Sequence, residues 1–493
     1  MTRRQARSIG ILTVLVLTAL LLPSTGQPTG EAAAAGRTQF QHIIVIVQEN
    51  RTPDNLFHGL CVPPFGAADR CSDMSIVLPT PVAVKKYNIQ TANWLDKAAP
   101  GGKITPTSVP LANKYDLDHS HRGFTRQCDA DPGTTQCKMD AAPARGFRFV
   151  GNATGVITPY LELATQYGWA NFMFQSNQGP SYPAHQFLFG GTSAPSAADD
   201  AAGIFAAENI TKTGIGGLKA IAGCNAPKGT TVELIGPSGE GKLIYPCFEH
   251  KTLADLLGTS LTWRYYTPSP GMIWTAPNAI EHICHGAPPA IAYTPCSGPE
   301  WDQHLDLHPA DVLSDIGNCK LRSLSWVIPT AANSDHANAN DGGGPSWVSS
   351  IVNAIGASKS CDGGQGYWEN TAIVVTWDDW GGWYDHVAPT FLAMPQGDYG
   401  HGFRVPLLVI SAYTPKGYIN NVQQDFGSIL RFAEHNFGIT EGALNFDDAR
   451  SKGDLSAFFD FTQPPRAFQV ITAPKSAAFF LHDTRPQGDP DDE

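Results

Sequence analysis

The sequence predicts an α/β fold in which helices cover both faces of a mostly parallel central sheet. Four apolar runs rich in β-branched residues are typical of strands buried on both faces of such a sheet. Segments with helical periodicity lie between and after these runs, and this alternation favours an α/β sheet. The predicted strands lie within residues 39–48, 324–328, 371–376 and 405–410, and the predicted helices within 159–167, 346–355 and 425–437.

The composition is that of a globular protein. Hydrophobic residues make up 42% and charged residues 16% of the 493 residues, so the chain can bury a large core. The formal net charge of −12 argues against a general attraction to nucleic acid or to an anionic membrane. We therefore expect no nucleic-acid partner, and we expect membrane contact only through a substrate.

Residues 1–36 have the pattern of a signal peptide that is removed on export. Three arginines within the first seven residues precede an apolar run at 9–22, and small residues follow at 32–35. The run is shorter than the roughly 20 apolar residues that a membrane-spanning helix needs. The alternative is an uncleaved membrane anchor. We predict a secreted or periplasmic protein.

Ten cysteines follow the predicted signal peptide. An even number of cysteines in an exported chain indicates disulfides, and the absence of any CxxC pair argues against a zinc ribbon. Pairing in sequential order would close four short loops and one longer loop, but other connectivities stay open. The cysteines are Cys61, Cys71, Cys128, Cys137, Cys224, Cys247, Cys284, Cys296, Cys319 and Cys361.

The mature chain is expected to form one catalytic domain over residues 37–484. Residues 61–145 are rich in Pro, Gly and Asp without a sustained period, which indicates a long insertion, and residues 193–246 resemble a second one. Residues 485–493 form a polar, acidic tail. The sequence has no Gly-rich phosphate loop of the P-loop or dinucleotide-binding kind, so we do not expect nucleotide binding of those types.

Acidic and amide side chains follow two of the predicted strands. Glu49 and Asn50 come directly after the first strand, where their oxygens suit a hard divalent cation. Asp378 and Asp379 follow the strand at 371–376, and two adjacent acids at a buried strand end are costly unless a cation neutralises them. The alternatives are ordinary polar turns, although the tryptophans around Asp379 argue against strong solvation.

A serine and two histidines are further candidates. Ser181 follows a Gly-Pro turn and precedes a segment that can begin a helix at Pro183, whose backbone amides would favour a phosphate oxygen. The alternative is that Ser181 only caps the helix. His119 and His336 lie close to acidic residues, which can hold an imidazole cationic to bind phosphate or protonate a leaving group. Each histidine could instead be structural.

These groups in this order resemble the bacterial phosphoesterase family, which holds phospholipases C and acid phosphatases with an alkaline-phosphatase-like α/β fold. The resemblance runs from about residue 40 to about residue 473. The Glu-Asn-Arg segment and the Asp-Asp-x-Gly-Gly-x-Tyr-Asp-His segment are together highly specific. The diagnostic segments are VIVQENRTPDNLFHG, GPSYPAHQFLFGG, SWVIPTAANSDH, TAIVVTWDDWGGWYDHVAP, and FRVPLLVISAYTPKGYI with SILRFAEHNFGI.

The resemblance implies a divalent metal ion of unknown identity and a phosphate-ester substrate, which is a small molecule or a lipid headgroup. The metal ligands that it implies are Glu49, Asn50, Ser181, Asp378 and Asp379. The catalytic residues that it implies are the nucleophile Ser181, the phosphate-pocket histidines His119 and His336, and His386 in a segment that recurs in the family.

The sequence departs from the family pattern at two positions of the site. Ala184 stands where an asparagine usually follows the proline of the nucleophile segment, and His185 could compensate for the missing phosphate contact. Phe426 stands where a histidine often follows the aspartate that opens a late helix. The extra C-terminal domains of the longer phospholipases are also not seen, which argues against a lipid substrate.

The function predicted from these residues is hydrolysis of phosphate esters by a secreted, metal-dependent, acid-phosphatase-like enzyme. Ser181 would attack phosphorus and form a phosphoserine intermediate. One alternative is a phospholipase C that cleaves phospholipid headgroups. A second alternative is a non-catalytic phosphate-binding protein on the same fold, and Ala184 is the residue that favours it.

Overall fold

The computed structural model describes residues 40–73, 83–131, 136–211, 221–286, 294–389 and 399–486. The predicted signal peptide and most of the predicted acidic tail lie outside the described residues. In the part of the chain that is described, no helix is long and apolar enough to cross a membrane.

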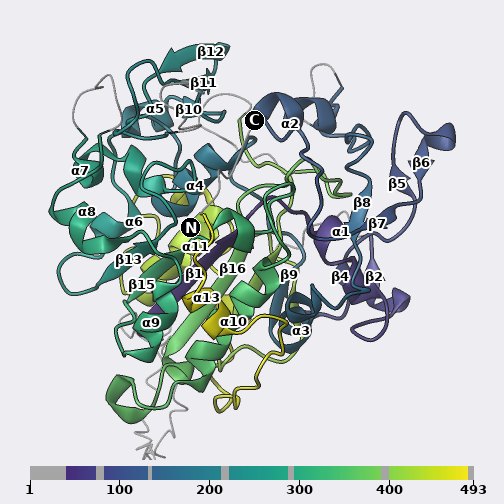
Figure 1. The fold of residues 1–493 in the computed structure, drawn as a ribbon. Coiled ribbons are helices and arrows are strands. Elements are labelled where there is room, and N and C mark those ends of the chain that lie inside the picture. Colours follow the sequence, from purple (N-terminus) through teal and green to yellow (C-terminus); the bar gives the residue numbers. More distant parts are fainter. Residues whose placement is uncertain are drawn as a thin grey trace, which may run out of the picture. The chain divides into compact units, whose positions relative to one another are not determined.

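Within the described residues, the centre of the fold is a nine-stranded mixed sheet (Figure 1). All neighbouring strands from β14 to β16 are parallel, and the antiparallel pairs lie beyond β16. The predicted α/β fold with a mostly parallel sheet is thereby confirmed. The strand order is β14 (Leu305–Asp306), β13 (Trp263–Tyr266), β15 (Leu324–Val327), β1 (His42–Gln48), β16 (Thr371–Trp377), β17 (Leu407–Ile410), β9 (Gly168–Ala170), β18 (Tyr418–Asn420) and β3 (Ala83–Val84).

The four apolar runs form strands β1, β15, β16 and β17, as predicted. The expectation of a parallel strand is wrong for β17, which runs antiparallel to both β16 and β9. An apolar run reports burial on both faces of the sheet by the helices that cover them, and this burial does not depend on the direction of the neighbouring strands. The short strands β9, β13 and β18 lack such a run and were not predicted.

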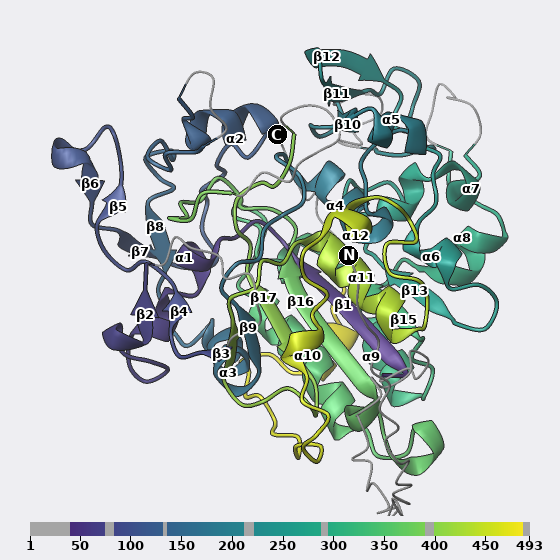
Figure 2. The same ribbon diagram turned by 180° about the vertical axis from the view of Figure 1, so that it is seen from behind.

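Different helices cover the two faces of the sheet. In the register of β1 with its neighbours, Trp326 and Trp377 lie on opposite faces. The indole of Trp326 donates to the Leu188 carbonyl of α4 at 3.1 Å, whereas the ring of Trp377 lies 5.2 Å from that of Tyr160 in α3. Helix α11 packs beside α4, and α10 packs beside α3. The two faces can be followed from opposite sides in Figures 1 and 2.

The helices predicted from periodicity are confirmed as α3 (Thr158–Gln166), α10 (Gly344–Ala357) and α11 (Phe426–Asn436). Helix α4 (Ser181–Gly190) begins two residues earlier than the helix start expected at Pro183. The other α-helices are α1 (Pro53–Leu56), α2 (His121–Cys128), α5 (Ala197–Ala201), α6 (Leu253–Leu256), α7 (Glu281–Cys284), α8 (Pro299–His304), α9 (Asp311–Gly317), α12 (Asp447–Arg450) and α13 (Ala477–Leu481).

The two segments interpreted as insertions carry small sheets outside the central one (Figure 1). The second segment holds the antiparallel sheet of β10 (Phe205–Ala206), β11 (Val232–Gly236) and β12 (Gly239–Ile244). In and beside the first segment lie helix α2 and the pairs β2 (Cys71–Ser72) with β4 (Tyr87–Asn88), β5 (Trp94–Leu95) with β6 (Lys103–Ile104), and β7 (Thr107–Val109) with β8 (Arg148–Val150).

The ten cysteines pair in sequential order. The disulfides are Cys61–Cys71, Cys128–Cys137, Cys224–Cys247, Cys284–Cys296 and Cys319–Cys361. Four of them close short local loops, and the fifth spans 42 residues. A full set of disulfides is typical of a protein that folds in an oxidising compartment.

A buried cluster of acids joins α11 to α12. Asp425 caps α11 and contacts the imidazole of His401 at 3.1 Å, while Asp447 accepts hydrogen bonds from the hydroxyl of Ser176 and from the Gly427 amide. Burial, together with the neighbouring charge of Asp425, raises the pKa of Asp447 to about 7, against the opposing effects of Arg450, Ser176 and His401. Asp447 therefore holds a proton in the folded protein where the unfolded chain has lost it.

We expect Asp447→Asn to remove part of the pH dependence of stability. A carboxyl whose pKa is raised on folding stabilises the fold at low pH, and this contribution is lost as the pH rises through its folded pKa. Relative to the variant, wild-type protein should lose unfolding free energy between about pH 4 and pH 7, the unfolded and folded pKa of Asp447, at up to about 1.4 kcal/mol per pH unit, and little more above pH 7. Urea unfolding at several pH values measures the difference. The partly exposed carboxylate variant Asp454→Asn is the control, and parallel pH curves for wild type and Asp447→Asn would contradict the prediction.

Candidate active site

The carboxyl ends of β1 and β16 place two predicted pairs of ligands side by side. Gln48 lies opposite Trp377 in register, so the residues that follow each strand leave the sheet together. The Asp378 amide donates to the Gln48 carbonyl at 3.0 Å, and the Asn50 amide donates to Oδ1 of Asp378 at 3.0 Å. The side chains of Glu49, Asn50, Asp378 and Asp379 are all buried.

Gly381 allows the two strand ends to approach this closely. Its φ is +60°, and a Cβ at this position would lie 2.3 Å from the Asn50 carbonyl oxygen. Asn50 itself has a φ of +62°, a left-handed conformation that asparagine tolerates better than most residues. The amide of Gly381 also donates to Oδ1 of Asp379 at 2.7 Å, which fixes that carboxylate.

The side-chain amide of Asn50 is oriented by its neighbours. Its nitrogen lies 3.0 Å from Nε2 of His119 and 3.4 Å from Oδ2 of Asp379. Its oxygen is buried without a hydrogen-bond partner among the described residues. An amide nitrogen is a donor and the amide oxygen an acceptor, so this orientation presents the oxygen as a ligand for a cation.

Ser181 belongs to the same buried group. It is the first residue of α4, and its hydroxyl donates to Oδ2 of Asp379 at 3.3 Å. The alternative that Ser181 only caps the helix is wrong, because the N-cap is Pro180 and the cap has no side-chain hydrogen bond. Asn209 was not predicted from the sequence; its side chain accepts from the Tyr182 amide at 3.0 Å and holds the start of α4.

The two histidines predicted to bind phosphate, His119 and His336, lie together beside this group. The rings of His119 and His336 are 5.9 Å apart, and both side chains are buried. Each ring is held through Nδ1, by the Leu117 carbonyl at 2.7 Å for His119 and by the Ala337 carbonyl for His336. The carbonyl contacts favour the tautomer in which Nδ1 carries the hydrogen.

His185 also enters the site, where its imidazole contacts two of the predicted carboxylate ligands. Its Nε2 lies 3.2 Å from Oε1 of Glu49 and 3.8 Å from Oδ2 of Asp378. The ring is stacked against Trp274 with centroids 6.3 Å apart. The sequence placed His185 four residues after Ser181, and this helical spacing was the signal that could have identified it.

The structure places His386 in a different cluster. Its ring nitrogens contact Asp54 at 2.7 Å and Asn88 at 3.0 Å. The adjacent Asp385 binds the buried guanidinium of Arg404 through both oxygens, at 2.8 and 2.9 Å. The structure does not bring His386 together with the other predicted site residues. An Asp-His pair in sequence cannot indicate which carboxylate the imidazole will bind.

A buried arginine and a buried aspartate hold the backbone next to the site residues. Arg51 donates to the Asp335 backbone carbonyl at 2.7 and 2.9 Å, and the Asp335 carboxylate accepts from Tyr160 at 2.8 Å and from Trp377 at 3.0 Å. Burial raises the pKa of Asp335 to about 6, although Arg51 and the two donors oppose the shift. These contacts fix the backbone on both sides of the site, next to Asn50 and to His336.

Helix α2 lies beside His119, and its start is bound by two glutamates from the segment around β10 to β12. Glu208 accepts from the amides of His121 and Arg122 at 3.0 and 3.4 Å, and Glu240 binds the imidazole of His121.

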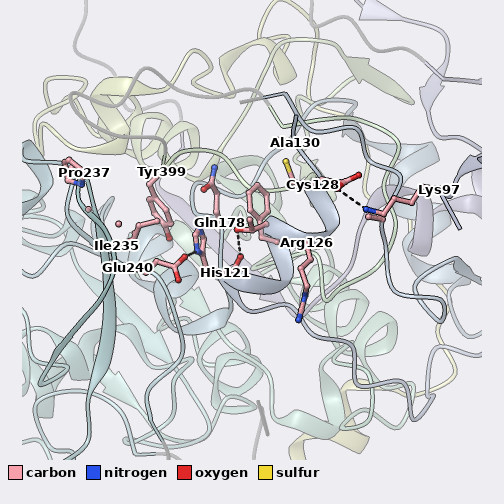
Figure 3. Close-up of a pocket in the computed structure, with 17 residues that line it drawn as sticks. Lys97, His121, Arg126, Cys128, Ala130, Gln178, Ile235, Pro237, Glu240 and Tyr399 are labelled. Carbon is pink, nitrogen blue, oxygen red and sulfur yellow. Dashed lines mark hydrogen bonds and ion pairs between the residues drawn. The ribbon is translucent and has the colours of Figure 1, made fainter. Parts of the chain in front are cut away.

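A cavity of about 950 Å³ lies between α2 and the β11–β12 hairpin (Figure 3). None of the predicted site residues lines it. Two residues that line this cavity, His121 and Gln178, lie near His119 and Ser181 in sequence.

The buried group has the chemistry of a divalent metal site. Glu49, Asp378 and Asp379 are three buried carboxylates, and burying like charges together is costly without a cation. The side-chain oxygen of Asn50 and Oδ2 of Asp378 have no hydrogen-bond partner in the described chain. Ligand atoms of Glu49, His185 and Asp378 lie within 4.8 Å of one another, so these residues could hold a metal ion.

Carboxylates at the ends of parallel strands, with a serine and histidines beside them, are typical of a hydrolase of the α/β class. The chain belongs to the Phosphoesterase family, whose sequence model matches residues 40–440. That match includes every residue of the buried group described above.

Curated relatives of the chain include bacterial phospholipases C. Non-hemolytic phospholipase C of Pseudomonas aeruginosa is 25% identical over 468 residues, which cover 86% of this chain and 58% of that protein. Phospholipase C B of Mycobacterium tuberculosis is 29% identical over 180 residues, which cover 32% of this chain and 33% of that protein. Both matches cover less than two thirds of the relative.

A solved structure of a protein in the alkaline phosphatase superfamily, from Vibrio parahaemolyticus, overlaps 76% of this chain and 74% of its own chain. The sequence identity is 12% and the TM-score is 0.30, which is too low to carry an argument about the fold.

We expect divalent metal to stabilise the protein through the carboxylate group. At a metal concentration one hundred times the Kd, binding adds about 2.7 kcal/mol to the unfolding free energy. Wild-type protein should therefore melt at a lower temperature after chelation and recover when metal is returned. Asp378→Asn should lose this response, and its metal-free form should be at least as stable as metal-free wild type because one buried charge has gone.

Thermal melting with and without chelator measures both effects. Asp311→Asn is the matched control, because Asp311 belongs to a separate exposed group with Asp306 and His308. An unchanged metal response in Asp378→Asn, or its loss in Asp311→Asn, would place the metal elsewhere.

Proposed function

We propose that the chain is a secreted, metal-dependent phosphoesterase that hydrolyses phosphate esters through Ser181. The observation that carries the proposal is the Ser181 hydroxyl 3.3 Å from Asp379, inside a buried group that also contains Glu49, Asn50 and Asp378. The five disulfides support export to an oxidising compartment, after removal of residues 1–36. The catalytic domain would comprise residues 37–484, with insertions near 61–145 and 193–246.

In this proposal, Ser181 is the nucleophile. A divalent ion held by Glu49, Asn50, Asp378, Asp379 and Ser181 would promote loss of the hydroxyl proton and neutralise charge on the phosphate. The Ser181 oxygen attacks phosphorus in line, a new oxygen–phosphorus bond forms, and the bond to the leaving alcohol breaks. A proton passes to the leaving oxygen. Water then hydrolyses the phosphoserine and releases phosphate or a phosphorylated headgroup.

The contacts of the two histidines favour His336 as the proton donor. Nε2 of His119 lies 3.0 Å from the Asn50 amide nitrogen, which is a donor, so this ring nitrogen accepts a hydrogen bond. His119 thereby orients Asn50 toward the cation position. His336 is held through the Ala337 carbonyl, and its ring lies 5.9 Å from that of His119.

Two substrate classes fit this site, and the relatives favour a phospholipase C over an acid phosphatase. The named relatives are phospholipases C, and one match covers 86% of this chain. A phosphodiester with a bulky alcohol would therefore be a better substrate than a small phosphomonoester.

We expect Ser181→Ala to lower kcat by roughly 1,000-fold or more, because the covalent step has no other nucleophile at that position. The assay compares p-nitrophenyl phosphate, p-nitrophenyl phosphorylcholine and phosphatidylcholine vesicles, each with and without chelator. Ser350→Ala is the matched control, since its buried hydroxyl donates to the Ser346 carbonyl within α10.

The same panel separates the alternatives. Faster hydrolysis of the monoester than of the two diesters supports the acid-phosphatase interpretation. Binding of metal and phosphate without turnover of any substrate by wild-type protein supports the non-catalytic alternative. Near-wild-type turnover by Ser181→Ala would overturn the assignment of the nucleophile.

We expect His336→Asn to slow hydrolysis most for esters with poor leaving groups. A p-nitrophenolate ion leaves without a proton, whereas an alkyl alcohol needs one, so loss of a general acid costs about 100-fold more for the alkyl ester. Steady-state kinetics on p-nitrophenyl and alkyl phosphorylcholine measure the ratio. His119→Asn is the comparison variant, and it should slow both esters alike. Equal losses for the two esters in His336→Asn would remove its role as the acid.

A further inference from the structure

Helix α4 brings a second group to the carboxylates besides the Ser181 hydroxyl. Ser181 and His185 are four residues apart in α4, so their side chains lie on the same face of the helix. That face is directed at the carboxyl ends of β1 and β16. Ser181 reaches Asp379, and His185 reaches Glu49 and Asp378.

The distance from His185 to Glu49 matches the spacing of ligand atoms around one metal ion, and the distance to Asp378 is a few tenths of an ångström longer. Nε2 of His185 lies 3.2 Å from Oε1 of Glu49 and 3.8 Å from Oδ2 of Asp378. Ligand atoms bound at about 2.1 Å in tetrahedral or octahedral geometry lie roughly 3 to 3.5 Å apart. The three atoms also lie within 4.8 Å of one another, so a single ion can contact all of them.

A hydrogen bond from His185 to Glu49 alone does not account for the arrangement. It leaves Oδ2 of Asp378 buried without a hydrogen-bond partner, and an unsatisfied buried carboxylate oxygen is costly. The side chains of Glu49 and Asp378 are fully buried, and that of His185 is 1% exposed. A cation between the three groups would satisfy both carboxylates and the imidazole together.

We infer that His185 is a further ligand of the metal ion and gives the site a preference for a borderline transition metal such as Zn²⁺ over Mg²⁺. The inference rests on the proposed metal-dependent function, and it adds a nitrogen ligand to the all-oxygen set predicted from the sequence. Oxygen ligands alone suit Mg²⁺, Ca²⁺ and Mn²⁺, whereas imidazole favours Zn²⁺ and its neighbours in the first transition row. Trp274 keeps the imidazole in place by stacking on it.

The test reads the metal directly and does not depend on turnover. Wild-type protein, His185→Ala and the control His250→Ala are stripped with chelator and dialysed against an equimolar mixture of Zn²⁺ and Mg²⁺, and bound metal is measured by elemental analysis. His250 is a buried histidine held by the Lys251 carbonyl at 2.9 Å, outside the carboxylate group. A second sample of each is loaded with Mn²⁺ for pulsed electron paramagnetic resonance, which detects a nitrogen ligand.

Wild type and His250→Ala should retain Zn²⁺ and show nitrogen coupling to Mn²⁺. His185→Ala should lose the coupling, and its ratio of bound Zn²⁺ to Mg²⁺ should fall about tenfold or more. If His185→Ala does not fold, His185→Gln, which keeps a polar side chain of similar reach, takes its place with the same expected result.

Failure of this inference is distinguishable from failure of the proposed function. If Glu49→Gln and Asp378→Asn lose the metal while His185→Ala keeps the Zn²⁺ preference and the nitrogen coupling, the role of His185 is overturned and the oxygen-ligand site stands. If wild-type protein binds neither Zn²⁺ nor Mn²⁺, the metal-dependent function and the inference fail together.

Discussion

The burial of three carboxylates at the ends of two parallel strands is the constraint on which the rest of the site depends. Because β1 and β16 are in register, Glu49 and Asp378 leave the sheet at the same level. Their mutual repulsion in a dry environment is unfavourable without a compensating cation. The left-handed turn at Gly381 and the imidazole of His185 arrange ligand atoms around the position that such a cation would take.

Hydrogen bonds from residues behind the ligands make this arrangement rigid. Arg51 binds the backbone of Asp335, and the Asp335 carboxylate binds the indole of Trp377. These bonds link the residue after Asn50, the residue before His336 and the residue before Asp378. Side chains that act on one phosphorus atom must be held within about 0.5 Å of the geometry that the reaction needs. A hydrogen-bonded network between three strand ends supplies that precision better than surface loops would.

The sequence predicted those parts of the molecule that depend on local pattern. Buried strands and amphipathic helices were predictable from periodicity, and the meeting of Glu49 with Asp378 follows from the rule that ligands gather at strand ends. The direction of β17 was not predictable, because an apolar run does not encode the direction of its neighbours. His386 was misplaced for a similar reason: Asp54, its partner, is 332 residues away in sequence. Distant partners such as Glu208 leave no local signal.

Access to the site and alignment of its side chains depend on the same contacts. The Ser181 and Asp379 side chains are buried, and His119 directly precedes the N-cap of α2. The start of α2 is bound by Glu208 and Glu240, which come from the segment around β10 to β12. A movement of that segment would therefore also move the residues next to His119. The central sheet holds the carboxylates of the site, whereas the peripheral segments hold the residues next to His119.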